Sequence, residues 1–118
     1  MELPVVRRLL EAINAHDPHA LAGCFTEDYS CAFPAHPERA FTGADQVRRN
    51  WSKVFAEHPD VRAAIAGSVT VGNETWAEWR FVWGSRPDDV GVIIVVATPD
   101  GSLIQQTRFY MEPVTPRS

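Results

Sequence analysis

The chain has 118 residues, 45% of them hydrophobic and 22% charged, with a net charge of −4. That length and composition fit one globular domain over residues 1–118 and exclude a disordered chain. An acidic balance with Lys53 as the only lysine argues against nucleic acid binding, and the lack of a long apolar run or signal peptide argues against a membrane protein and predicts a cytoplasmic one.

The first third of the chain predicts two helices and a strand. Apolar residues at helical spacing predict a helix over residues 3–15 that buries one face. Asp17 and Pro18 are typical of a helix N-terminus and predict a short second helix that carries Phe25. Residues 28–33 predict a short strand, because they are aromatic or small and a proline follows directly.

The rest of the chain predicts a third helix and a run of strands. The segment from Thr42 to Asp45 resembles a capping box and predicts a helix that ends at His58. From Val61 the apolar pattern has a period of two, with short turns that make neighbouring strands antiparallel. The expected strands cover residues 61–71, 74–84, 90–98 and 102–112. This order predicts an α+β fold, with helices on one face of a strongly bent sheet.

The order of elements, together with the strings TWAEWRFVW and RFYMEPV, resembles the nuclear transport factor 2-like superfamily. Within it, the chain is similar to SnoaL-like and ketosteroid-isomerase-like small bacterial proteins over residues 3–114. The resemblance implies a cone-shaped, cystatin-like fold, in which three N-terminal helices pack on a curved, mostly antiparallel sheet around a deep pocket. It also implies a homodimer through the outer sheet face, and functions that range from isomerase and cyclase to plain binding.

The isomerases of this family supply a test of the enzymatic interpretation. They use a tyrosine on the first helix, an aspartate base before a proline, and an acid on a late strand. The resemblance places Leu9, Phe33 and Ile93 at these positions. Because none of these side chains gains or loses a proton, we expect no isomerase mechanism with that set. Glu78-Trp79-Arg80 matches the Asp-Arg-Asp arrangement of epoxide hydrolases only superficially, since alternation turns both charges away from the apolar side.

The last predicted strand offers candidate catalytic groups. The resemblance implies that Gln106, Arg108 and Tyr110 face the pocket. Arg108 would then stabilise negative charge on a substrate oxygen, and Tyr110 would donate a hydrogen bond to the same atom. Alternatively, Arg108 pairs with an acid such as Asp28 or Glu112, as a buried charge must.

His36 is the third catalytic candidate, because the loop after the first strand lies near the pocket entrance implied by the resemblance. It would act as an acid or base near neutral pH, or else it is a solvated loop histidine. Aromatic side chains would line the pocket, although the same spacing also suits plain core. The candidates for this lining are Tyr29, Phe33, Trp51, Phe55 and Trp79, with Gln106 beside them.

Three functional hypotheses follow. The first is a protein that binds a small apolar molecule and acts as an isomerase or cyclase on a carbonyl compound. The second is a non-catalytic binding or accessory domain, and the third is a structural dimer whose pocket is filled by side chains. We expect no cofactor and no metal, because no His/Cys spacing resembles a zinc site and Cys24 and Cys31 fit reduced thiols.

Overall fold

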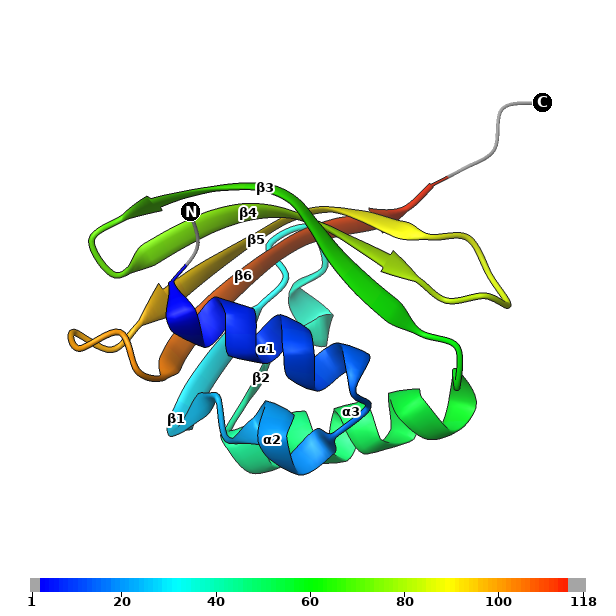
Figure 1. The fold of residues 1–118 in the computed structure, drawn as a ribbon, viewed down its shortest axis with the longest axis horizontal. Coiled ribbons are helices and arrows are strands. Elements are labelled where there is room, and N and C mark those ends of the chain that lie inside the picture. Colours follow the sequence, from blue (N-terminus) through cyan, green and yellow to red (C-terminus); the bar gives the residue numbers. More distant parts are fainter. Residues whose placement is uncertain (1–2, 115–118) are drawn as a thin grey trace.

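The computed structural model describes residues 3–114, which form three α-helices, one 3-10 helix and a six-stranded sheet (Figure 1). The elements follow the chain as α1 (Pro4–Asn14), α2 (Pro18–Ala22), β1 (Phe25–Ala32), η1 (Pro37–Arg39), β2 (Phe41–Thr42), α3 (Ala44–Glu57), β3 (Arg62–Val71), β4 (Glu74–Val82), β5 (Asp89–Ala97) and β6 (Ile104–Pro113). The three helices lie under the concave face of the curved sheet. The predicted α+β class and helix-on-sheet layering are confirmed.

The strands are ordered β2-β1-β6-β5-β4-β3 across the sheet. Strands β3 to β6 form an antiparallel meander, as their short turns predict, whereas β1 pairs with β6 in parallel. A parallel pair needs a long connection, which here includes α3 and the whole meander. The pairing therefore places β1 and its side chains against the last strand of the chain.

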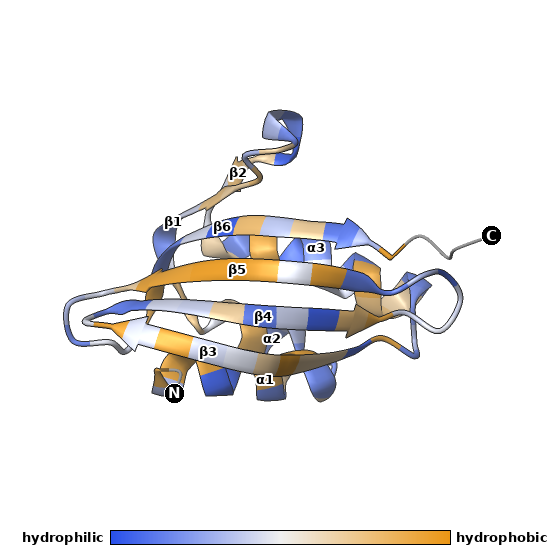
Figure 2. Ribbon diagram, turned by 90° about the horizontal axis from the view of Figure 1, so that it is seen from above, coloured by the Kyte–Doolittle hydropathy of each residue, from blue (hydrophilic) through white to orange (hydrophobic). Residues whose placement is uncertain are grey.

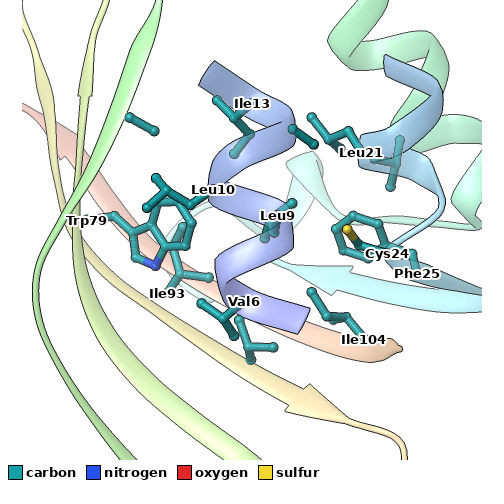
Figure 3. Close-up of a cluster of buried hydrophobic side chains, with 14 of the residues drawn as sticks. Val6, Leu9, Leu10, Ile13, Leu21, Cys24, Phe25, Trp79, Ile93 and Ile104 are labelled. Carbon is teal, nitrogen blue, oxygen red and sulfur yellow. The ribbon is translucent and has the colours of Figure 1, made fainter. Parts of the chain in front are cut away.

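Helix α1 connects the sheet to the other elements through its apolar face. Pro4 occupies the first helical position, where its missing N–H has no intrahelical acceptor. Figure 3 shows α1 between the sheet residues Trp79 and Ile93 and a second group that includes Leu21 and Phe25. Since both groups are buried, α1 stabilises the fold from two sides.

Predictions about two helix ends are wrong. Helix α2 begins as expected, with the Asp17 carboxylate accepting a hydrogen bond from the Ala20 N–H at 3.0 Å, but it ends at Ala22, so Phe25 starts β1 instead. The capping box does not form: Thr42 pairs with Ser30 as part of β2, and Gly43 caps α3 with φ of 96°. That left-handed conformation favours glycine and lets the chain turn from strand to helix.

Strand β5 passes very close to β6 at Gly91. A Cβ atom at this position would overlap the carbonyl oxygen of Tyr110 and lie 2.8 Å from the Met111 Cα. Gly91 thus permits the close approach of two central strands. Within residues 3–114, no helix has the length and apolar character needed to span a membrane.

Candidate functional site

A cavity of about 200 Å³ lies between the helices and the concave face of the sheet. Its helical wall comes from residues of α1 and α3, both of which lie on the concave side of the sheet (Figure 1). The residues of this wall are Leu9, Ile13, Val47, Asn50, Trp51 and Val54.

The opposite wall comes from inward-facing residues of the sheet. Trp79, Phe81, Ile93, Thr107 and Phe109 line it from β4, β5 and β6. Phe25, Tyr29, Cys31, Phe33 and Phe41 complete the lining from β1, β2 and the residue after β1. In each strand the lining residues follow the two-residue period, because alternate side chains point to the same face.

Burial distinguishes the entrance of the cavity from its interior. Phe33 and Phe109 are half-buried, and their rings stack with centroids 4.9 Å apart. Trp51 is also half-buried, and its ring packs edge-on against the ring of Phe81 with centroids 5.9 Å apart. Tyr29, in contrast, is only 2% exposed. The cavity therefore has an aromatic entrance and a closed inner end.

The inner end holds a pair of hydroxyl groups. The Tyr29 hydroxyl and the Thr107 Oγ1 are 2.5 Å apart, a short hydrogen bond between residues that are far apart in the chain. Burial raises the pKa of the Tyr29 phenol well above its usual value. The pair is therefore uncharged at any physiological pH.

The thiol of Cys31 lies beside these hydroxyls. Burial raises its pKa, and its contacts with Tyr29 and Thr107 oppose that increase only in part. A thiol with a raised pKa is a poor nucleophile at neutral pH. Cys31 is therefore a small neutral lining group.

Asn50 and the indole N–H of Trp79, which is buried without a hydrogen-bond partner, are the remaining polar groups of the lining. The Gln46 Nε2 donates a hydrogen bond to the Asn50 Oδ1 at 2.7 Å, which leaves the amide hydrogens of Asn50 available. Among the described residues that line the cavity there is no Asp, Glu, His, Lys or Arg. The cavity thus offers hydrogen bonds but no charge.

The structure brings together four of the six residues predicted for the pocket lining. Tyr29, Phe33, Trp51 and Trp79 line the cavity. Phe55 lies outside the lining, where its ring stacks on His16 with centroids 4.6 Å apart. Gln106 also lies outside, because it alternates with the lining residue Thr107 and shares the other face of β6 with Arg108.

The expectation that Arg108 and Tyr110 face the cavity is wrong. Both residues lie on the outer face of the sheet, where Arg108 is in register with Ile94 and borders a shallow groove with Trp76. Their neighbours Thr107 and Phe109 line the cavity instead. Because side chains alternate along a strand, the apolar neighbours exclude Arg108 and Tyr110 from the interior.

His36 contacts carboxylates at the edge of the sheet. Its Nε2 is 2.6 Å from the Glu112 Oε1, and its Nδ1 is 3.9 Å from the Glu38 Oε2. It is not part of the cavity lining, although Phe33 in the same loop is. Glu112, suggested by the sequence as a counter-ion for Arg108, therefore contacts His36. A role of His36 in proton transfer stays a prediction.

The sequence interpretation did not select Thr107 and Asn50. The signal for Thr107 was present, because it alternates with Phe109 and Met111 in the more apolar half of its strand. The signal for Asn50 was its helical spacing from Val54, since residues four apart share one face of a helix.

The positions that correspond to isomerase groups also lie in the cavity. Leu9, Phe33 and Ile93, which the resemblance places at these positions, all line it with apolar side chains. No group of three or more His, Cys, Asp and Glu side chains within residues 3–114 is arranged to hold a metal ion.

The profile of the SnoaL-like domain family matches residues 6–106. The chain belongs to the SnoaL-like family. No curated protein matches this SnoaL-like chain in sequence. Its fold is similar to that of many solved structures, and the three described below are 11–20% identical to it in sequence.

Three of these structures represent the fold. A protein of unknown function with a cystatin-like fold from Methylobium petroleophilum has a TM-score of 0.79 at 20% identity, with 97% of this chain and 76% of that chain covered. A protein with a ketosteroid-isomerase-like fold from Catenulispora acidiphila, in complex with trimethylamine, has a TM-score of 0.75 at 18% identity. The match covers 92% of this chain and 87% of that chain. A nuclear transport factor 2-like protein of unknown function from Cytophaga hutchinsonii has a TM-score of 0.76 at 11% identity, and the match covers 96% of this chain and 94% of that chain. The SnoaL-like protein thus has the predicted cystatin-like, nuclear transport factor 2-like fold.

Proposed function

We propose that this SnoaL-like protein binds a small, uncharged and mostly apolar molecule in the cavity between α1, α3 and the sheet. The observation that carries the proposal is the lining, in which aromatic and aliphatic side chains surround a few neutral polar groups. Small-molecule sites usually have this composition.

The absence of charge among the described lining residues selects for uncharged ligands. An ion that leaves water for an apolar cavity loses its hydration, at an effective cost of several kcal/mol unless a counter-ion is present. This cavity supplies no such counter-ion. A carboxylate or an ammonium ion should therefore bind far more weakly than a neutral molecule of the same shape.

The volume of the cavity selects for molecules of about one ring. An apolar cavity of about 150 Å³ is large enough to bind benzene. The cavity here, at about 200 Å³, has room for a six-membered ring with one substituent. A four-ring substrate would not fit without movement of the aromatic entrance.

The same lining supports binding without proton-transfer catalysis. An isomerase that acts through an acid and a base needs groups that exchange protons near neutral pH. Burial raises the pKa of both Tyr29 and Cys31, and the other lining residues carry no titratable group. We therefore favour a non-catalytic binding protein over an isomerase or cyclase.

A thermal unfolding experiment with matched six-membered rings tests the proposal. Cyclohexanol, cyclohexanone and methylcyclohexane are the neutral compounds, and cyclohexanecarboxylate is the charged control. A neutral ligand at ten times its Kd should raise the unfolding temperature by about 6 °C, since binding to the native state adds about 1.4 kcal/mol. The carboxylate should cause no shift at the same concentration. An equal shift with the carboxylate, or none with any neutral ring, would overturn the proposal.

A homodimer through the outer sheet face is the second part of the proposed function. Figure 2 shows this face, with the largely hydrophobic strand β5 at its centre. Val69 is 63% exposed there, Trp76 49% and Tyr110 45%. Exposed apolar side chains grouped on one face favour an interface. The wild-type protein should sediment as a dimer and a Trp76→Glu variant as a folded monomer, whereas a wild-type monomer at high concentration would contradict this part.

A further inference from the structure

The hydroxyl pair at the inner end of the cavity has hydrogen-bonding capacity left over. Tyr29 and Thr107 each carry one donor hydrogen, and the bond between their oxygens uses one of the two. The second hydrogen has the sulfur of Cys31 beside it, and sulfur is a weak acceptor. Because Cys31 holds this second hydrogen only weakly, a better acceptor can take it, and the oxygen that donates within the pair keeps free lone pairs.

The burial of the pair makes this free capacity significant. Tyr29 is 2% exposed and Thr107 is 1% exposed, so bulk water does not satisfy them. Both residues line the cavity with the Cys31 thiol, and the indole N–H of Trp79, another lining residue, is buried without a hydrogen-bond partner. A ligand that reaches the inner end is therefore the group that can complete their hydrogen bonds.

A ligand hydroxyl matches the pair better than a carbonyl does. A hydroxyl can accept the free hydrogen and donate its own hydrogen to the other oxygen of the pair, which forms two bonds and a closed array of three hydroxyls. A carbonyl oxygen can only accept, so it forms one bond. A hydrocarbon forms none, and leaves the pair as it is.

We infer that the Tyr29–Thr107 pair is the specificity-determining polar contact of the cavity, and that its ligand is a neutral, one-ring alcohol or phenol. The ring fills the apolar space near α1 and α3, and the hydroxyl points to the inner end between β1 and β6. The inference rests on the proposed function, because it names the chemical class of ligand for the same cavity.

The test compares how removal of the pair changes the affinity for three matched rings. The variant Tyr29→Phe/Thr107→Val removes both hydroxyls and keeps the shapes, so we expect little loss of stability. For each ligand, the Kd of the variant is divided by the Kd of the wild type. The free energy needed to remove that ligand from water is the same in both measurements and cancels in this ratio. Kd values follow from the fluorescence of Trp51 and Trp79, which line the cavity. The control variant is Tyr110→Phe, which removes a hydroxyl from the outer face.

The double variant should bind cyclohexanol at least about tenfold more weakly and cyclohexanone about threefold more weakly, because two bonds and one bond are lost. Methylcyclohexane should bind the variant as tightly as the wild type, and Tyr110→Phe should change none of the three values. If the double variant does not fold, Thr107→Val alone should weaken cyclohexanol binding more than methylcyclohexane binding.

Two results would overturn the inference and leave the proposed function intact. The first is an unchanged affinity for cyclohexanol, and the second is an equal loss for alcohol and ketone. Failure of the wild type to bind any of the three rings would instead overturn the proposed function itself.

Discussion

Filling the cavity from α3 should weaken ligand binding and stabilise the protein. Val47 lines the cavity, is 2% exposed and has open space in front of it. A Val47→Phe change adds about 50 Å³ of side chain, and at roughly 24 cal/mol per Å³ of cavity removed it should stabilise the fold by about 1 kcal/mol. For a chain of this length the unfolding temperature should increase by about 4 °C.

The assay combines thermal unfolding with ligand titration. Since about a quarter of the space that receives the ring is lost, the Kd for cyclohexanol should increase at least about tenfold. The matched control is Val71→Phe, because Val71 is 73% exposed at the β3–β4 turn and does not border the cavity. This control should change neither the unfolding temperature nor the Kd.

The reasoning would be refuted by a Val47→Phe protein that is destabilised by more than about 1 kcal/mol, which is the usual effect of adding atoms to a filled core. It would also be refuted if the variant bound cyclohexanol as tightly as the wild type, since the ligand would then occupy another site.

Three further predictions address the fold and the outer face. Gly91→Ala should destabilise the protein by about 3 kcal/mol or more in denaturant unfolding, because the new methyl group meets the backbone of β6; a loss below 1 kcal/mol would show that the strands separate easily. Arg108→Ala should leave the Kd for cyclohexanol within about twofold of wild type, because Arg108 lies outside the cavity. A tenfold increase in this Kd would show that Arg108 takes part in ligand binding. Asp100 has its pKa lowered to about 2 by hydrogen bonds from Thr98 and Ser102, so it stabilises the native state above its ordinary pKa, and this contribution is lost as pH falls toward 2. The free energy of unfolding of the Asp100→Asn variant should therefore be lower than that of the wild type at pH 6 and should approach it near pH 2. A difference in this free energy that stays constant between pH 6 and pH 2 would contradict the assignment.

Local patterns in the sequence predicted most of the fold. The helical spacing before Asn14 and the two-residue period after Val61 follow from burying one face of each element, and such patterns are readable without tertiary structure. They located all three α-helices and all four strands of the meander. The predicted ends of elements were wrong where a short segment could form either of two local structures. Thr42 could cap a helix or pair in the sheet, and it pairs with Ser30.

The candidate site was predicted in part, because its lining depends on which face of each strand is covered. The alternation around Trp79 assigned its inner face correctly, since the opposite positions, Glu78 and Arg80, are charged. In β6 both faces mix polar and apolar residues, and the resemblance led to the face of Arg108 and Tyr110. The structure covers the other face, where Thr107 is 1% exposed.

The sequence by itself determined the class of fold and the apolar character of the interior, because both follow from residue types repeated at a fixed period. Only the tertiary structure decided that Tyr29 and Thr107 share a hydrogen bond. The two residues are 78 positions apart, and they meet because β1 and β6 pair in parallel with Cys31 opposite Thr107. That pairing depends on how the whole sheet assembles, and no local pattern in either strand encodes it.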